Sequence, residues 1–199
     1  KSDVSYYLAD MNFKLGKFEK AIELGLPLLK RTKRTEHSEI SKIVGESYFN
    51  IKNYNEAIPH LKNYKGKRGK WNNTDFYLLG YSYFQQKDYE NAIEFTMKAI
   101  DVQKEDSVSL SARYNNLAVI YRNIMNFESA LEYNLKSLEI SIALKDSLGM
   151  AKSYNNLGLV SENLNNLDKA FDGFKIIQLS DLHLGSFFDG SSIQSSRKL

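Results

Sequence analysis

The sequence contains no cysteine, which excludes disulfide bonds and metal sites built on thiolates. It contains only two prolines among 199 residues, which suits a chain that is helical over most of its length. No apolar run approaches the roughly 18 residues that are needed to span a bilayer. Charge of one sign is also lacking, because 27 basic residues nearly balance 24 acidic ones, and this balance does not favour a nucleic-acid-binding protein.

What the sequence does contain is repetition. Two segments that lie 40 residues apart are near-copies, YNNLA at 114–118 and YNNLG at 154–158. Twelve residues after the end of each segment comes an alanine, Ala130 or Ala170, with an apolar residue three positions before it. A self-match at such a period is typical of a stacked repeat array.

The same pattern extends back along the whole chain in three series of positions, which step by 36, 35, 38 and 40 residues. A small residue recurs at Ala9, Gly45, Gly80, Ala118 and Gly158. The alanine recurs at Ala21, Ala57, Ala92, Ala130 and Ala170. The apolar residue before it recurs at Phe18, Tyr54, Tyr89, Phe127 and Leu167. Small residues at fixed positions indicate two helices that pack closely together.

This pattern resembles the tetratricopeptide repeat family, with LGYSY at 79–83 and YENAI at 89–93 as matching text. In that family a small residue on a first helix precedes an aromatic residue and an alanine on a second, at about 34 residues per unit. The resemblance covers roughly residues 4–174. It implies an all-α fold, a right-handed α-solenoid of about five helix–turn–helix units. The later units, which step by 38 and 40 residues, are longer than the family's period of about 34 residues. In this they are similar to the extended repeats of bacterial regulators and signalling proteins.

The spacing divides the chain into an array over residues 1–180 and a tail over 181–199. The units of the array are expected at about 4–31, 38–63, 73–102, 108–144 and 150–180. The tail is rich in serine and glycine from about residue 185 onward, and we expect it to be mobile. Within the units, Asn53 or Asn55 is expected to cap a second helix. A buried helical stripe is expected at Leu131, Leu135, Leu138 and Ile142.

Stacked helix pairs form a superhelix, and the resemblance implies a concave groove lined by the first helices. Projecting each first helix inward predicts a partner-binding groove of thirteen residues, Tyr6, Asp10, Phe13, Lys42, Glu46, Phe49, Tyr77, Tyr81, Phe84, Asn115, Arg122, Asn155 and Glu162. Aromatic anchors with polar neighbours suit a bound peptide or helix. The alternative is that these rings pack between units and contact no partner.

These features predict a protein–protein interaction scaffold or adaptor, and the resemblance to extended repeats suggests the sensor or regulatory part of a larger bacterial signalling protein. No nucleophile–base pair, phosphate-binding glycine loop or zinc spacing occurs in residues 1–174, so we expect neither an enzyme nor a cofactor. The expected partner is a protein or peptide, and neither a nucleic acid nor a membrane. The oligomeric state does not follow from the sequence. The chain begins at Lys1, so the lack of a targeting segment leaves the compartment open, with the cytoplasm favoured.

A basic loop offers a competing hypothesis. Lys62, Lys65, Lys67, Arg68 and Lys70 surround two glycines and precede Trp71. Cations beside a stacking ring can hold a nucleic-acid strand, so RNA binding is an alternative to a solvated loop. A second basic segment, residues 30–34, could contact an acidic partner, but we interpret it as a solvated linker at a helix end, where cations suit the helix dipole.

The C-terminal passage KIIQLSDLHLG at 175–185 resembles the first motif of the calcineurin-like metallophosphoesterases. That resemblance implies that Asp181 and His183 are metal ligands. The family needs further Gly-Asp, Gly-Asn-His and Gly-His-x-His motifs, and no histidine follows His183 in this chain. Two ligands do not complete a metal site, so we predict none here. The alternative function is that of the N-terminal recognition region of a truncated or fused metal-dependent phosphoesterase.

The same letters also fit a helix. Leu167, Ala170, Phe174 and Ile177 fall at helical steps, which predicts a helix to about Ser180. A strand at this place would lack a sheet to pair with. In the helical interpretation, Asp181 and His183 are simply an exposed acid and an exposed histidine.

Overall fold

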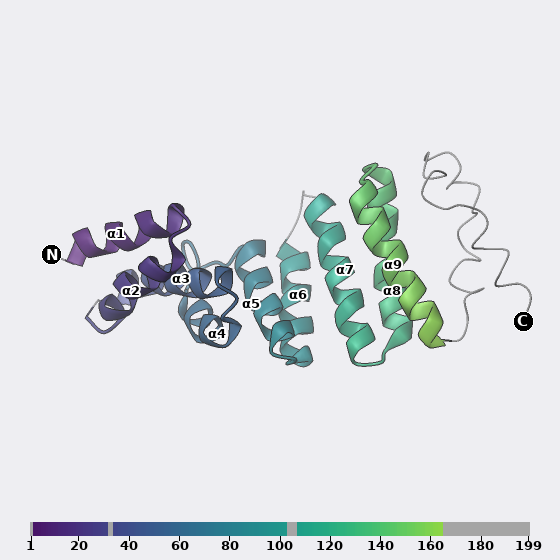
Figure 1. Ribbon diagram of the computed structural model, residues 1–199, viewed down its shortest axis with the longest axis horizontal. Coiled ribbons are helices and arrows are strands. Elements are labelled where there is room, and N and C mark those ends of the chain that lie inside the picture. The colour runs from purple at the N-terminus through teal and green to yellow at the C-terminus, as the bar shows by residue number, and fades with distance from the viewer. Residues whose placement is uncertain (1, 32–33, 103–106, 165–199) are drawn as a thin grey trace, which may run out of the picture.

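The computed structural model describes residues 2–31, 34–102 and 107–164, and within these ranges it contains nine α-helices and no extended strand. Figure 1 shows the helices as antiparallel hairpins that stand side by side in one row. The helices are α1 (Ser2–Lys14), α2 (Phe18–Leu29), α3 (Arg34–Asn50), α4 (Tyr54–Asn63), α5 (Asn73–Gln85), α6 (Tyr89–Val102), α7 (Ser107–Asn123), α8 (Phe127–Ala143) and α9 (Ser147–Leu164). The predicted all-α solenoid is therefore confirmed.

Each hairpin joins a first helix to a second helix, in the pairs α1–α2, α3–α4, α5–α6 and α7–α8. Each later first helix also contacts the second helix that precedes it, so the hairpins stack on one another from end to end. The helix α9 begins a fifth hairpin. The helix predicted to follow it up to Ser180 and the predicted mobile tail 181–199 both lie outside the described residues.

The turns inside the hairpins share one backbone conformation. The residue two positions before each second helix has a positive φ angle, at Gly16 (72°), Lys52 (63°), Lys87 (60°) and Met125 (61°). In the second of these turns, the Lys52 N–H donates to the Phe49 carbonyl and the Asn53 N–H donates to the Tyr48 carbonyl, both at 2.9 Å. Such left-handed residues close a helix by satisfying its last carbonyls, which lets the chain reverse within a few residues.

Each second helix of the four complete hairpins begins at the aromatic residue of the repeat pattern. The side chain of Asn53 caps α4 by accepting a hydrogen bond from the Glu56 N–H at 3.4 Å, so the capping prediction holds for Asn53. Asn126 caps α8 in the same way, accepting from the Ser129 N–H at 3.0 Å. These caps satisfy backbone donors that would otherwise lack an intrahelical partner.

The repeated small residues lie where helices cross most closely. The alanines that recur along the chain are fully buried, at Ala9, Ala21, Ala57, Ala92 and Ala130. At Gly45 the approach is closer still, since a Cβ atom there would lie 2.9 Å from the backbone nitrogen of Leu61. The small residues of the repeat pattern therefore mark the positions where two helices pack closely.

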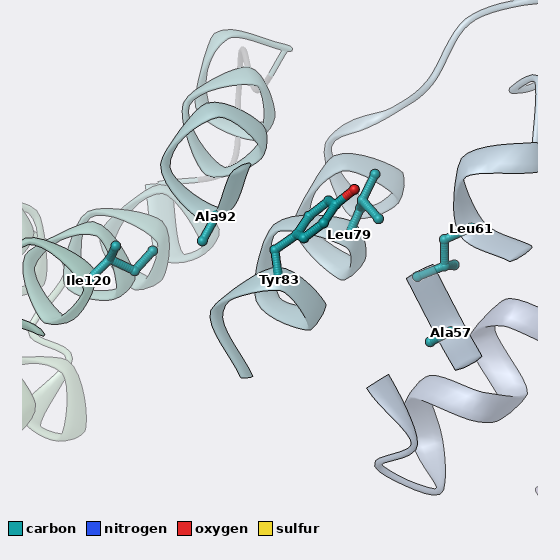
Figure 2. Packing of buried hydrophobic residues seen from close by; sticks show 6 residues of the cluster. All are labelled: Ala57, Leu61, Leu79, Tyr83, Ala92 and Ile120. Atoms are coloured by element: carbon teal, nitrogen blue, oxygen red, sulfur yellow. The ribbon is translucent and has the colours of Figure 1, made fainter. Parts of the chain in front are cut away.

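The core runs along the row between neighbouring hairpins. Figure 2 shows Leu79 and Tyr83 of α5 between Leu61 of α4 and Ala92 of α6. The last hairpins have a separate cluster built on Leu138, Met150 and Leu157. The stripe predicted for α8 is confirmed, because its remaining residues pack against this cluster at Leu131, Leu135 and Ile142.

Four buried serines add a polar seam between α7, α8 and α9. The Ser111 hydroxyl lies 3.1 Å from the Ser137 hydroxyl and 2.8 Å from the Ser141 hydroxyl. The Ser137 hydroxyl donates to the Ser111 carbonyl at 2.9 Å, and the Ser153 hydroxyl donates to that of Ser137 at 3.1 Å. Mutual hydrogen bonding is what makes burial of these hydroxyls tolerable.

Candidate functional site

The structure places all thirteen predicted groove residues on the first helices α1, α3, α5, α7 and α9. Eleven of them are half-buried, and Asn155 and Glu162 are exposed. None is part of the fully buried core. Each side chain can thus contribute to a surface, but their environments differ strongly along the row.

The central part of this surface is a group of rings around Tyr81, which we call the Tyr81 cluster. The ring centroid of Tyr81 lies 5.7 Å from that of Phe49 on α3, 5.9 Å from that of Tyr77 and 6.3 Å from that of Phe84 on α5. Tyr54, the first residue of α4, completes the cluster at 5.8 Å from Tyr81. Most of these contacts are edge-on or tilted, the arrangement that aromatic quadrupoles favour.

A small cavity of about 20 Å³ opens beside this cluster, between the third and fourth hairpins. Tyr77, Tyr81 and Phe84 of α5 line one side of it, and Asn116 and Val119 of α7 line the other. Gly80, Thr96 and Ile120 complete its lining. The recess has room for about one water molecule, so a partner side chain would pack on the rings and the amide around it and would not enter it.

Tyr77 connects the cluster to α7. The Arg113 guanidinium lies 5.5 Å from its ring centroid, a cation–π contact across the two hairpins. Burial raises the pKa of the Tyr77 phenol, and a hydrogen bond with Asn116 only partly opposes this effect. The hydroxyl is therefore neutral at physiological pH and can act as both donor and acceptor.

A group of charges lies one helical turn away from these rings. The Lys42 ammonium is 2.8 Å from Oδ1 of Asp75 on α5 and 3.5 Å from Oε1 of Glu46 on α3. It also lies 4.5 Å from the ring centroid of Tyr64. This arrangement connects two neighbouring first helices, so two predicted groove residues also contribute to the interface between hairpins.

The electrostatics of this group follow from its burial. Burial lowers the pKa of Lys42, but the hydrogen bond to Asp75 and the charges of both carboxylates outweigh it and hold that pKa above its usual value. Burial raises the pKa of Glu46, and the nearby Lys42 charge offsets this only in part. Asp75 is the closer partner of Lys42, and burial makes the negative charge of Glu46 less favourable.

The two ends of the predicted groove are built differently from its centre. On α1, Asp10 accepts from the Lys14 ammonium at 2.6 Å, while Tyr6 and Phe13 pack against the buried Ala9 and its neighbours. At the other end, Asn115 accepts a hydrogen bond from the Asn156 amide at 3.3 Å, which connects α7 to α9. The structure brings together the residues of α3 and α5, and it does not join those of α1 or α9 to them.

Four further residues shape this surface that were not among the predicted groove residues, namely Tyr54, Asp75, Asn116 and Val119. A signal existed for Asp75, because an asparagine followed three residues later by an acidic residue is a pattern typical of a capping box. In the structure the Asn72 N–H donates to the Asp75 carboxylate, and the Asp75 N–H donates to the Asn72 side chain, both at 2.9 Å. The repeat pattern had also singled out Tyr54. No comparable signal distinguishes Asn116 from Asn115, since the repeat carries both asparagines together.

The basic loop lacks the stacking ring that RNA binding was expected to use. The Trp71 indole N–H donates to the Tyr64 carbonyl at 2.8 Å, and its ring packs on Phe76 and Phe95 at 5.2 and 6.3 Å. The ring is half-buried and belongs to the core that surrounds Tyr83. The lysines and Arg68 are exposed, with Gly66 and Gly69 at positive φ angles of 80° and 78°. Cations alone therefore remain on this loop's surface.

The described residues contain no group of three or more His, Cys, Asp or Glu side chains that could hold a metal ion. No helix among them is long and apolar enough to cross a membrane. Asp181 and His183 lie outside this part of the chain.

Comparison with known families identifies the repeats. Residues 76–106 and residues 110–144 each match a family model described as tetratricopeptide repeat. These segments are the hairpins α5–α6 and α7–α8, which carry most of the Tyr81 cluster and the cavity beside it. The chain thus contains tetratricopeptide repeats. Neither match reaches residues 175–185, and the metallophosphoesterase resemblance of that passage is not supported.

Solved structures show the same fold. YrrB, described as a tetratricopeptide repeat protein with an unusual peptide-binding site, aligns over 100% of this chain and 93% of its own with a TM-score of 0.70 and 16% identity. MamA aligns over 84% of this chain and 90% of its own, with a TM-score of 0.66 and 24% identity. BtubC from P. vanneervenii covers 92% of this chain and 79% of its own, at a TM-score of 0.63 and 18% identity. The fold is that of a tetratricopeptide-repeat solenoid.

Proposed function

We propose that this chain is a non-enzymatic scaffold that binds a peptide or helix of a partner protein on its first-helix surface, with the Tyr81 cluster as the anchor site. The observation that carries the proposal is the gathering of half-buried rings around Tyr81, three of which line the recess between the third and fourth hairpins. The predicted residues of α1 and α9 contribute, in this proposal, to the course of the bound segment on either side.

The physical chemistry of the cluster supports this role. Its rings are held by contacts with one another, so a partner side chain meets a surface that loses little conformational entropy on binding. The rings supply apolar area, while the Tyr77 hydroxyl and the Asn116 amide supply directional hydrogen bonds at the rim. Binding energy at interfaces concentrates on such aromatic positions. The peptide-binding site named for YrrB supports the same use of this fold.

A finer role is part of the proposal, namely that the scaffold serves as the sensor or regulatory part of a larger bacterial signalling protein. The step of 38 and 40 residues in the later units, similar to the extended repeats of such regulators, supports it. Deleting the region that encodes this chain from its native gene should then abolish the response of that signalling system while its output activity persists.

Selection from a random 12-residue peptide library displayed on phage tests the binding role without knowledge of the natural partner. We expect the chain to enrich peptides that share an aromatic or aliphatic anchor residue. A labelled peptide from that selection should lose affinity at least about tenfold on Tyr81→Ala, because truncating an anchor residue costs 2 kcal/mol or more.

The control is Tyr7→Ala, which removes the same side chain from a site on α1 that is 66% exposed. It should leave peptide affinity unchanged, and circular dichroism should show the same helicity in both variants. Equal affinity of the Tyr81→Ala variant and the unmodified chain would refute the proposed anchor site.

A further inference from the structure

The first helix exposes an apolar stripe at the end of the array. Val4, Tyr7, Leu8, Met11 and Leu15 are 64%, 66%, 40%, 49% and 61% exposed. Their spacing of three and four residues places the first four on one face of α1, and Leu15 follows directly after the end of that helix. Figure 1 shows α1 at the N-terminal end of the row of hairpins. The outer face of a terminal repeat is ordinarily polar, because a solenoid end must face water.

The repeat register explains what this stripe is. Adding the step of 36 residues moves Val4, Leu8 and Met11 of α1 onto Ile40, Val44 and Ser47 of α3, all three with 0% exposure. The position of Leu8 recurs in later first helices at Leu79, Leu117 and Leu157, which are at most 1% exposed. The position of Met11 recurs at Ser82, Ile120 and Val160, which are at most 2% exposed. The positions of Leu8 and Met11 are therefore buried in α3, α5, α7 and α9 and exposed in α1.

In each of those helices the buried face packs on the second helix of the preceding hairpin. At the first such interface, Leu28 of α2 forms one cluster with Ile40 and Val44 of α3. The contact is close, since a Cβ atom on Gly25 would lie 2.5 Å from Cγ2 of Val44. At this interface α2 presents a small residue, Gly25, over Val44 and an aliphatic residue, Leu28, near it.

We propose that α1 is a stacking face, which receives the second helix of a further hairpin of the tetratricopeptide type in the register in which α3 receives α2. The incoming helix carries a small residue over Leu8 and an aliphatic side chain one turn later, as Gly25 and Leu28 do on α2. Continuity with the stacking interfaces inside the array is the argument for this occupant.

The stripe does not suit a second copy of α1. It contains no glycine, alanine or serine, so two copies would bring Tyr7, Leu8 and Met11 face to face. Bulky residues on both helices hold the two backbones apart. A hairpin with a small residue at the crossing point allows the close approach that α2 and α3 make. This surface is separate from the Tyr81 cluster, so the proposal does not depend on the peptide-binding role.

Duplication of a hairpin tests the proposal directly. A second copy of residues 2–37, inserted before Ser2, preserves the step of 36 residues and places a copied α2 before α1. We expect the midpoint of thermal unfolding to rise by roughly 5–10 °C, given about 2–4 °C for each kcal/mol in a chain of this size. No rise, or a fall, would overturn the proposal.

A matched variant separates stacking from the mere addition of residues. Leu8→Lys and Met11→Lys, introduced together in the receiving helix, should remove most of the gain in the extended chain. In the unextended chain they should change the midpoint little, because both side chains are already exposed. An equal loss in both chains would show that the stripe is not a stacking face.

Sedimentation of the unextended chain tests the competing occupant. We expect a monomer at protein concentrations up to about 100 μM, which lie well above the dissociation constant of a stable dimer. A dimer that the same two lysine substitutions dissociate would assign the stripe to a second copy and overturn the proposal.

Discussion

The ammonium group of Lys42 on α3 lies 2.8 Å from the carboxylate of Asp75 on α5, and this pair joins the first helices of two neighbouring hairpins. Asp75 is only 6% exposed, and its second oxygen accepts a hydrogen bond from the Asn72 N–H at 2.9 Å. One carboxylate therefore both caps α5 and fixes α5 against α3. It is one of the contacts that hold the third hairpin against the second.

Replacing Lys42 by methionine should destabilise the chain by about 1–3 kcal/mol, because Asp75 is left as a buried charge that has lost its counterion. Chemical denaturation at neutral pH measures the effect. Lys20→Met is the control, since Lys20 and Glu23 form a bridge of similar length, 2.7 Å, on an exposed helix surface. Exposed pairs contribute little, so this variant should change the free energy of unfolding by about 0.5 kcal/mol or less. Equal effects of the two substitutions would contradict the interpretation.

Glu46→Gln should change how stability depends on pH. Burial raises the pKa of Glu46 in the folded chain, so above the ordinary glutamate pKa of about 4.3 the folded state binds more protons than the unfolded state. Stability contributed by this group therefore falls as pH rises through that window. The variant lacks this loss, so it should exceed the unmodified chain in stability at pH 7 and match it near pH 4. Urea denaturation at the two pH values decides, and parallel curves would exclude the effect.

Gly45→Ala should destabilise the chain by about 1–3 kcal/mol, as expected when a packed site is overfilled. The new methyl group would lie 2.9 Å from the backbone nitrogen of Leu61, which cannot move without shifting α4. Helix propensity alone predicts the opposite sign, a gain of about 1 kcal/mol. Ala118→Gly is the reciprocal control in the same repeat position, and it should lose stability through propensity. A gain for Gly45→Ala would show that the helices separate freely.

Asn134→Leu should stabilise the chain by about 1–3 kcal/mol, the cost of burying an unpaired amide. Asn134 lies on α8 with 0% exposure, and neither of its amide atoms has a hydrogen-bond partner among the described residues. The equivalent position of the second hairpin already holds a leucine, Leu61, which is buried in the core. Asn134→Ala separates polarity from shape, since it removes the amide and leaves a void. A loss of thermal stability in the leucine variant would contradict this account.

The repeat pattern was enough to predict the helical hairpins and their order. A small residue and an alanine twelve positions apart can meet only if the chain reverses between them, so the spacing itself encodes the hairpin. The aromatic residue before the alanine marked the start of each second helix, as at Tyr54 and Tyr89. These features are local and repeat, which is why the sequence is sufficient to predict them.

The pattern was not enough to predict the details between hairpins. The left-handed residues Lys52, Lys87 and Met125 have no sequence signal, because glycine is the residue that announces such a turn. The inward position of Trp71 depends on Phe95, which lies 24 residues further along the chain. Neighbouring residues on a helix point about 100° apart, so small changes in helix orientation decide whether Asn115 or Asn116 reaches the cavity. Such contacts depend on the angle between hairpins, which the repeat does not specify.

The serine seam between α7, α8 and α9 has a mechanical consequence. Apolar side chains can slide past one another at little cost, whereas hydroxyl bonds are directional and weaken steeply when they are bent. The bonds that join Ser111, Ser137, Ser141 and Ser153 therefore lock the crossing angles of these three helices. The first and second hairpins meet through aliphatic contacts instead, at Leu28, Ile40 and Val44. We therefore expect any change in the curvature of the solenoid to concentrate at this N-terminal joint, while α7, α8 and α9 move as one rigid block.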